Sequence, residues 1–320
     1  MLFRSSTSAR YVAMEVEQTP WSVSPEGCFE GVRRMARAIP LGAHKRDILR
    51  SMNTLVNRTA VVTGAASGIG KALAHRLARE GCHLALVDID GEALERARGE
   101  FASTGRTVSL HVANVADRAR MLALPEEVLA AHGHVHLLVN NAGVSVAGRF
   151  EEVGLEDLDW IFGVNFWGMV HGCKAFLPHL RREPEAHIVN LCSSFGLLGF
   201  AGKTGYSATK FAVRGFSEAL RAELLGSPVG LTVVYPGAVD TNIVRAGRAV
   251  NEAQREAEAR FITGRAIPTD RVASRIVQGI RRNSARVLIG LDYHLIDWLA
   301  RLSPDLSQEV TARLSQRMPF

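Results

Sequence analysis

The chain has 320 residues, of which 47% are hydrophobic and 22% are charged, and its formal net charge is +6. These values are typical of a globular protein, and one α/β domain of about 250 residues with appendages fits them better than two equal domains. The basic residues are spread along the chain and mixed with acids, which argues against a nucleic-acid-binding protein.

Cysteine spacing and hydropathy argue against two further classes of protein, those held together by a disulfide framework and those with a transmembrane helix. The four cysteines form no CxxC pair and no regular framework, which predicts reduced thiols and a cytoplasmic protein. No stretch approaches the run of about 18 uncharged apolar residues that a transmembrane helix needs. Residues 287–302 are expected to form a strand and then an amphipathic helix, and peripheral membrane contact there is a minor alternative.

Residues 1–51 differ from the rest of the chain. They begin with a stretch rich in Ser and Arg, contain Pro20 and Pro25, and show no strand or helix periodicity. We predict a loosely ordered N-terminal extension over residues 1–51, with an upstream start codon or a transit peptide as alternatives. Residues 52–320 are expected to form the compact domain, because Met52 stands shortly before the first strand.

From Thr59 onward, short β-branched runs alternate with helical stretches. Strands are predicted at residues 60–63, 84–87, 107–112, 135–139, 187–191, 231–235 and 287–289. The runs are nearly all apolar, as parallel strands covered on both faces should be. The alternation predicts an α/β fold with a doubly wound, Rossmann-like parallel sheet, in which ligands bind at the carboxyl ends of the strands.

A glycine-rich turn follows the first predicted strand. Residues 63–70 read TGAASGIG and open a helix that is expected over residues 71–79. Glycines permit a tight turn and a close approach of the backbone to a pyrophosphate at the helix N-terminus, where free N–H groups favour anions. The spacing Gly-x-x-x-Gly-x-Gly is not the common dinucleotide fingerprint, so a plain strand–helix turn is the alternative.

Asp88 stands at the end of the second predicted strand. A carboxylate at this position would accept hydrogen bonds from the adenosine ribose hydroxyls and repel a 2′-phosphate, so NAD is preferred over NADP. Ser67 stands where a basic residue would favour the extra phosphate, although Arg96 and Arg98 are not far off in sequence. The alternative role for Asp88 is that of a helix N-cap.

Further along, the NNAG segment from Asn140 to Gly143 ends the fourth strand, where small residues leave room for a flat ligand and amides can tie strand ends together. Tyr206 and Lys210 then stand four residues apart, so they are neighbours on one helix face. A free tyrosine has a pKa of about 10, so acid–base work near neutral pH needs a neighbour that stabilises the phenolate. On spacing alone, a structural role for this pair is an equal alternative.

Three motifs that are far apart in the sequence occur together in one known family. The TGxxxGxG turn, the NNAG segment and Ser193 with the YxxxK pair make the chain resemble a single-domain short-chain dehydrogenase/reductase over residues 57–289. The resemblance implies an oxidoreductase that transfers a hydride between a nicotinamide cofactor and a secondary alcohol or ketone. It also implies that Tyr206 is the general acid/base, that Lys210 holds the nicotinamide ribose and lowers the phenol pKa, and that Ser193 binds the substrate oxygen. Asn165 would anchor a water that links Lys210 to solvent.

The same resemblance places the cofactor. Residues 236–241 resemble the nicotinamide-side loop of the family, in which the Val239 backbone and the Thr241 hydroxyl would hold the carboxamide. Asn114 stands where the family usually has an aspartate that faces the adenine amino group. The implied cofactor-binding residues are Gly64, Ser67, Gly68, Ile69, Gly70, Asp88, Asn114, Val115, Asn141, Ala142, Gly143, Tyr206, Lys210, Pro236, Gly237, Val239 and Thr241.

The substrate and the partners are less well determined by the sequence. Four apolar residues after Ser193 suggest the wall of an apolar pocket, with core packing as an equal alternative: Phe195, Leu197, Leu198 and Phe200. Residues 242–267 stand where the family places its substrate lid and are expected to form an exposed amphipathic helix. Helices expected at 160–180 and 207–225 match the oligomer interface of the family, which implies a homodimer or homotetramer.

Two other functions on the same fold remain as alternatives: a non-catalytic protein that senses NAD(H), and an NADP-dependent carbonyl reductase. His132, His134 and His136 alternate, but no carboxylate or thiol cluster accompanies them in the sequence, so no metal site is predicted.

Overall fold

A computed structural model describes residues 52–239, 241, 243, 247–252, 255–256, 260 and 266–315. The predicted N-terminal extension lies outside the described residues, as does much of the predicted lid. The division of the chain at residue 52 therefore stays a prediction.

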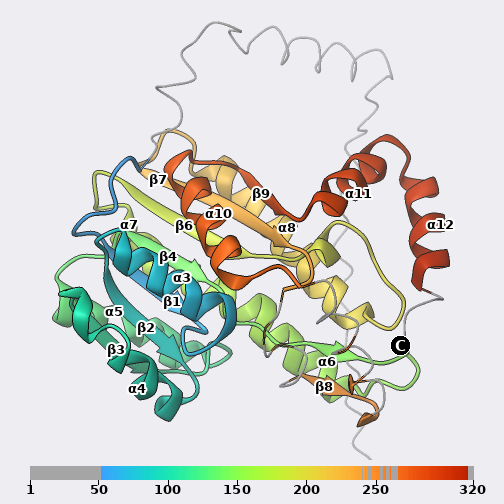
Figure 1. Ribbon diagram of the computed structural model, residues 1–320, viewed down its shortest axis with the longest axis horizontal. Coiled ribbons are helices and arrows are strands. Elements are labelled where there is room, and N and C mark those ends of the chain that lie inside the picture. Colours follow the sequence, from blue (N-terminus) through green and yellow to red (C-terminus); the bar gives the residue numbers. More distant parts are fainter. Residues whose placement is uncertain are drawn as a thin grey trace, which may run out of the picture. The chain divides into compact units, whose positions relative to one another are not determined.

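Seven parallel strands form the main sheet, in the order β3-β2-β1-β4-β6-β7-β9 (Figure 1). They are β1 (Thr59–Thr63), β2 (His83–Asp88), β3 (Val108–Val112), β4 (Leu137–Asn140), β6 (Ala186–Leu191), β7 (Val229–Pro236) and β9 (Arg286–Ile289). The chain runs outward from β1 to β3 and then crosses back to β4, so the strand order reverses between β1 and β4. The predicted doubly wound parallel sheet is confirmed, and this reversal is where such sheets bind ligands.

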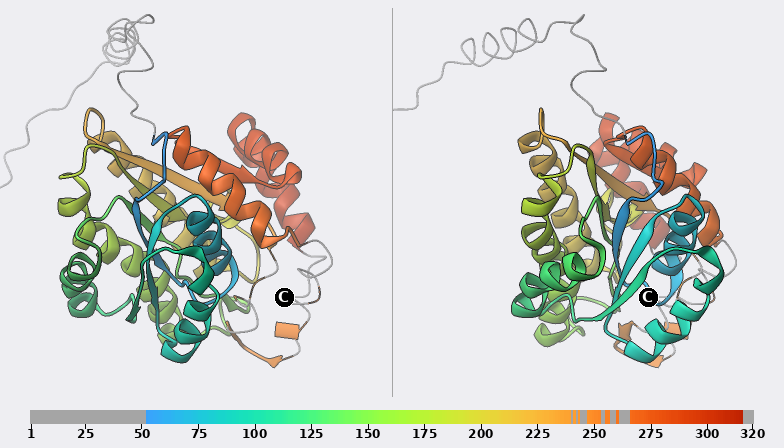
Figure 2. Two further views of the ribbon diagram at one scale, coloured as in Figure 1. Left: turned by 60° about the vertical axis from the view of Figure 1, so that its left-hand side comes forward. Right: turned by 90° about the vertical axis from the view of Figure 1, so that its left-hand side faces the viewer.

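Helices cover both faces of the sheet (Figure 2). One face carries α3 (Gly68–Arg79), α4 (Gly91–Gly99) and α10 (Thr269–Arg281), and the other carries α5 (Arg118–His132), α7 (Gly168–Leu180) and α8 (Thr204–Glu223). Val61 and Val62 of β1 are both fully buried, but Val61 packs in the cluster under α5, α7 and α8, whereas Val62 packs in the cluster under α3 and α10. This burial on both faces explains the continuous apolar runs.

Short elements and C-terminal helices complete the described part. They are η1 (Ala102–Thr104), β5 (Val146–Ala147), α6 (Leu155–Phe162), the π-helical turn η2 (Gly163–Trp167), η3 (Ser194–Gly196), β8 (Arg248–Ala249), α11 (Leu291–Leu302) and α12 (Pro304–Ser315). Strands β5 and β8 pair in parallel as a separate small sheet, which was not predicted from the sequence. Within the described ranges, no helix is both long and apolar enough to cross a membrane.

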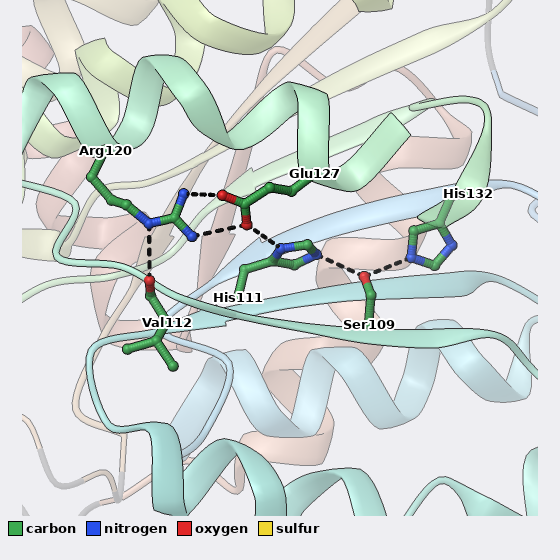
Figure 3. A network of polar contacts seen from close by, with 6 residues as sticks. All are labelled: Ser109, His111, Val112, Arg120, Glu127 and His132. Carbon is green, nitrogen blue, oxygen red and sulfur yellow. Dashed lines mark hydrogen bonds and ion pairs between the residues drawn. The ribbon is translucent and has the colours of Figure 1, made fainter. Parts of the chain in front are cut away.

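A chain of polar contacts fastens α5 to the edge strand β3 (Figure 3). Arg120 forms two bonds to the Glu127 carboxylate, at 2.6 and 2.9 Å, and Glu127 Oε2 lies 3.1 Å from His111 Nδ1. His111 Nε2 is 2.7 Å from Ser109 Oγ, which in turn is 2.8 Å from His132 Nε2. The hydrogen bonds from Arg120 hold the pKa of Glu127 below its usual range, and burial lowers the pKa of His132 to about 4. None of these residues lines the cavity described below, so we interpret the network as structural.

The three alternating histidines have structural partners, and His134 and His136 both contact Glu183. Besides His132, His134 Nδ1 lies 2.9 Å from Glu183 Oε1, and His136 Nδ1 accepts a hydrogen bond of 3.1 Å from the Thr59 N–H. Burial lowers the pKa of His136 to about 4, which keeps the ring neutral and able to accept that bond. The residues that the structure describes include no group of three or more His, Cys, Asp or Glu able to hold a metal ion.

A buried histidine makes the stability of the fold depend on pH. His187 is 1% exposed, bonds Thr232 Oγ1 at 2.8 Å, and has a pKa lowered by burial from 6.5 to about 3. Between pH 6.5 and about 3, the unfolded chain holds a proton on His187 and the folded chain does not. The free energy of unfolding should therefore fall by about 1.4 kcal/mol for each unit by which the pH decreases across this range. Urea unfolding of the wild type and of His187→Gln at several pH values measures this slope. In His187→Gln the free energy of unfolding should depend less steeply on pH, because one titrating histidine has been removed. An unchanged slope would contradict the low pKa of His187.

Candidate active site

A cavity of about 480 Å³ opens at the carboxyl ends of the strands, and Asp88, Asn141 and Pro236 from three of these ends line it. All of the predicted cofactor-binding residues line this cavity except Gly70, which packs against the Gly64 carbonyl oxygen. Of the predicted catalytic residues, Ser193, Tyr206 and Lys210 line the cavity and Asn165 does not. Residues that are far apart in sequence therefore meet at one site, as the motifs predict.

The glycine-rich turn leaves the N-terminus of α3 accessible to a ligand. A Cβ at Gly70 would stand 2.0 Å from the Gly64 carbonyl oxygen, so only glycine fits where the helix crosses the turn. Gly64 itself has a φ of +64°, which favours glycine. Ser67 is the N-cap residue and its side chain makes no capping bond, and the first turn holds no acidic residue. The free N–H groups and the helix dipole therefore make a place suited to a phosphate.

Asp88 fastens the glycine-rich turn to the neighbouring loop. Its Oδ2 accepts a hydrogen bond of 3.0 Å from the Ala66 N–H, and its Oδ1 accepts one of 3.2 Å from the Asp90 N–H. The N-cap of α4 is Asp90, whose side chain accepts from the Ala93 N–H, so the alternative of Asp88 as that cap is wrong. Both carboxylate oxygens keep acceptor capacity toward the cavity that Asp88 lines.

The NNAG segment ties β4 to the end of β1. Asn141 Nδ2 donates to the carbonyl oxygens of Thr63 and Gly64 at 2.9 and 3.1 Å. Thr63 Oγ1 accepts hydrogen bonds of 3.0 Å from the N–H groups of Asn141 and Ala142. The amide therefore ties strand ends together, as predicted, and the turn that would hold the cofactor is built on it.

Tyr206 and Lys210 lie on one face of α8, beside the end of β6. Lys210 Nζ is 5.5 Å from the centroid of the Tyr206 ring and donates a 3.1 Å hydrogen bond to the Leu191 carbonyl oxygen. Lys210 is 4% exposed, and this burial lowers the pKa of its ammonium group below the usual value. Tyr206 is in the first turn of α8, where the helix dipole favours a negative charge. An ammonium group and a helix N-terminus, both of which favour a negative charge, thus lie beside the Tyr206 ring.

Cys192 lies directly behind this pair. Its Sγ donates to the Lys210 carbonyl oxygen at 3.1 Å, and burial raises the pKa of the thiol to about 11. A thiol that stays protonated is a poor nucleophile. We therefore interpret Cys192 as a packed residue at the end of a strand.

Asn165 holds the loop behind Lys210 rather than facing the cavity. Its Oδ1 accepts from the Val144 N–H at 2.8 Å, and its Nδ2 donates to the Val144 carbonyl oxygen at 3.0 Å. It belongs to the π-helical turn η2, a conformation often found at functional sites. A Cβ built on Gly143 would lie 3.2 Å from Asn165 Oδ1 and 3.7 Å from Lys210 Nζ, so both groups flank that glycine.

The remaining part of the cavity has an apolar wall. Phe195 and Phe200 line it, with ring centroids 4.7 Å apart, and the Phe195 ring meets the Tyr206 ring edge-on at 5.6 Å. Leu197 and Leu198 do not line it, and Leu197 packs in the core cluster instead. The apolar-wall interpretation is therefore right for the two phenylalanines and wrong for the two leucines.

The described start of the segment that was predicted as a lid is fastened to α6. Strand β8 pairs with β5 and lies near α6 (Figure 1). The Arg248 guanidinium lies 4.1 Å over the Trp160 ring and 2.7 Å from Asp157 Oδ1. Trp160 lines the cavity, although the helix expected at residues 160–180 was predicted only as part of an oligomer interface. Lys203 and Ser145 also line it and were not predicted, because they belong to no motif.

Comparison with known proteins agrees with the fold and the motifs. The family model "short chain dehydrogenase" matches residues 58–252. The oxidoreductase SadH of Mycobacterium tuberculosis is 38% identical over 265 residues, which cover 82% of this chain and 96% of that protein. A Streptomyces avermitilis protein, 1-deoxy-11-beta-hydroxypentalenate dehydrogenase, is 39% identical over 190 residues, which cover 58% of this chain and 70% of that protein.

A solved structure shows the same architecture. The short-chain dehydrogenase/reductase of Burkholderia phymatum in complex with NAD superposes with a TM-score of 0.74 at 32% identity, covering 80% of this chain and 97% of that one. The chain therefore belongs to the short-chain dehydrogenase/reductase family. It is an NAD(P)-dependent oxidoreductase that acts on CH–OH groups.

Proposed function

We propose that this enzyme transfers a hydride between NAD(H) and a secondary alcohol or ketone with a largely apolar body. The observation that carries the proposal is the convergence of Ser193, Tyr206 and Lys210 on one cavity that also reaches the glycine-rich turn and Asp88. When bound, the nicotinamide supplies or accepts the hydride, and the protein supplies binding, orientation and proton transfer.

The cavity fits a dinucleotide along its length. The N-terminus of α3, with its glycines and the unengaged Ser67 side chain, would hold the pyrophosphate, and Asp88 would accept from the adenosine ribose hydroxyls. Asn114 lines the cavity, and its Oδ1 accepts from the Ala116 N–H at 3.0 Å. At the other end, Val239 and Thr241 would hold the carboxamide.

Three side chains would carry the proton chemistry. Tyr206 would protonate the carbonyl oxygen during reduction and take the alcohol proton during oxidation. The Lys210 ammonium would stabilise the phenolate, and its bond to the Leu191 carbonyl oxygen fixes its position. The Ser193 hydroxyl would donate to the substrate oxygen and orient it. The remaining lone pair of Asn165 Oδ1 would bind a water molecule beside Gly143, and this water would link Lys210 to solvent.

The preference for NAD rests on Asp88. Its carboxylate is held at the cavity by the Ala66 and Asp90 N–H groups, where it would repel a 2′-phosphate. Asp88→Ala should weaken NAD binding by about tenfold, the effect of losing hydrogen bonds to a charged group, and should narrow the discrimination against NADP. Fluorescence titration with NADH and NADPH measures both effects. If the variant keeps the wild-type ratio of the two affinities, the Asp88 argument fails, and an NADP-dependent reductase becomes the better interpretation.

An apolar substrate and an oligomeric state are also proposed. Phe195, Phe200 and Trp160 supply apolar cavity wall. Trp167 and Phe211 are 48% and 42% exposed on the helices that correspond to the predicted interface, which supports a homodimer or homotetramer. The cytoplasmic location stays a prediction.

A further inference from the structure

Arg248 is held beside the wall of the cavity by its backbone. Strand β8 pairs in parallel with β5, and the Arg248 N–H donates a 2.9 Å hydrogen bond to the Ser145 carbonyl oxygen. Two residues later, the Val250 N–H donates a 3.1 Å hydrogen bond to the Ala147 carbonyl oxygen. Ser145 lines the cavity. Two backbone hydrogen bonds therefore fix where the Arg248 side chain begins.

The Arg248 side chain extends from β8 to α6. Its guanidinium carbon lies 4.1 Å from the centroid of the Trp160 ring, and its Nη1 lies 2.7 Å from Asp157 Oδ1. Asp157 stands in the first turn of α6, three residues before Trp160. A planar guanidinium can stack on an aromatic face and bind a carboxylate at the same time, which the ammonium group of lysine cannot do. Arg248 therefore joins β8 to α6 through the ring of Trp160 and the carboxylate of Asp157.

Trp160 connects this contact to the cavity, because it is partly buried and belongs to the lining. The other aromatic lining residues are held by ring contacts, since the Phe195 centroid lies 4.7 Å from that of Phe200 and 5.6 Å from that of Tyr206. The Trp160 ring has the Arg248 guanidinium over it instead. A wall residue that is already held need not be immobilised when a ligand binds, so the ligand binds without that entropy cost.

Strand β5 joins Arg248 to the apolar part of the wall. Lys203 Nζ bonds Ser145 Oγ at 2.9 Å, and the Lys203 N–H donates to the Phe200 carbonyl oxygen at 3.2 Å. Ser145 also accepts the hydrogen bond from the Arg248 N–H through its carbonyl oxygen. The strand that carries Arg248 is thus bonded to the part of the wall that contains Phe200.

We propose that Arg248 is a positioning residue of the substrate pocket, which holds the Trp160 ring as a fixed wall for the apolar body of a bulky alcohol or ketone. The proposal rests on the proposed function, because it places the reacting oxygen of that substrate at Tyr206. Arg248 does not line the cavity and acts through Trp160. A substrate too small to reach Trp160 does not depend on Arg248, so this contact sets the selectivity for substrate size.

A bulky and a small cyclic ketone test this selectivity. The full-length enzyme is assayed with NADH and either 4-tert-butylcyclohexanone or cyclopentanone. Arg248→Gln should lower the ratio of kcat/KM for the bulky and the small ketone by about 2- to 10-fold, the cost of immobilising one side chain on binding. The loss should appear in KM rather than in kcat, because Arg248 contacts no reacting group.

Arg149→Gln is the matched control for the loss of a surface arginine. Arg149 pairs with Glu151 at 3.0 Å, is 68% exposed and does not line the cavity. The substitution makes the same chemical change near β5 and should keep the wild-type ratio.

A double-mutant cycle shows whether Arg248 acts through Trp160. Trp160→Leu should itself lower the ratio, and adding Arg248→Gln should bring no further loss, because the ring under the guanidinium is gone. The positioning role is overturned if Arg248→Gln leaves the ratio unchanged, lowers kcat/KM equally for both ketones, or keeps its full effect in the Trp160→Leu background. In each of these cases the proposed function stands, because the ketones are reduced.

Crystal structures of the wild type and of Arg248→Gln test the positioning without any substrate. The Trp160 ring should adopt a second rotamer or show raised B-factors in the variant, while Phe195 stays as in the wild type. If the wild type reduces neither ketone, the proposed function fails, and these structures decide the inference alone. A Trp160 ring with the wild-type rotamer and B-factors in Arg248→Gln overturns it, and a displaced or more mobile ring supports it.

Discussion

Replacement of Tyr206 by phenylalanine is expected to lower kcat/KM by about 10²- to 10⁴-fold, the usual contribution of a general acid/base. The substitution keeps the ring and its edge-on contact with Phe195, which is 5.6 Å away, and removes only the hydroxyl group. The Lys210 ammonium, held by the Leu191 carbonyl oxygen, would then have no phenolate to stabilise. Steady-state kinetics by nicotinamide absorbance measures the loss, and fluorescence titration should show that NADH still binds.

Tyr235→Phe is the matched control for this experiment. Tyr235 is fully buried on β7 and does not line the cavity, so the variant removes a phenol hydroxyl away from the site and should keep the wild-type kcat/KM. If Tyr206→Phe and Tyr235→Phe both retain activity, Tyr206 is not the acid/base and the proton must come from another group in the cavity.

Replacement of Gly70 by alanine is expected to disrupt the cofactor site. The added methyl group would stand 2.0 Å from the Gly64 carbonyl oxygen and 2.5 Å from Asn141 Nδ2, so the turn and α3 would have to separate. Overpacking of this kind costs about 1–3 kcal/mol, which corresponds to a rise of about 5- to 150-fold in the Kd for NADH if the distortion falls on the turn. Titration of NADH fluorescence measures the Kd, and circular dichroism shows whether the fold is kept.

Gly99→Ala serves as the control for the glycine experiment. A Cβ at Gly99, the last residue of α4, meets no atom within 4 Å, so the same chemical change should leave NADH affinity as in the wild type. Wild-type affinity in Gly70→Ala would mean that the close packing of α3 on the turn is not needed for cofactor binding. Equal loss in both variants would point to a general effect on stability.

The parts of the fold that depend on local patterns could be predicted from the sequence. The strands were predictable because their residues are buried on both faces, as Val61 and Val62 show, and the pairing of Tyr206 with Lys210 follows from helical spacing. The glycine-rich turn was predictable because the close approach of its backbone segments requires glycine, as at Gly70, where a Cβ would collide with the Gly64 carbonyl oxygen.

Features that depend on contacts between distant segments could not be predicted. Lys203 is buried because its loop packs on Ser145, 58 residues earlier in the chain. Trp160 lines the cavity and packs against Arg248 of β8, a residue distant in sequence. The cap of α4 was ambiguous, since Asp88 and Asp90 are both aspartates beside the same strand end, and only the bond to the Ala93 N–H distinguishes them.

The central claim is that this cavity transfers a hydride to a carbonyl carbon while Tyr206 protonates its oxygen. The most direct test uses NADH deuterated at the transferable position, a panel of apolar ketones, and mass spectrometry of the products. The wild type should place deuterium on the carbinol carbon of at least one product, and Tyr206→Phe should place almost none. If the wild type binds NADH tightly and transfers deuterium to no ketone in the panel, the account is contradicted, and a protein that senses NAD(H) without catalysis explains the site better.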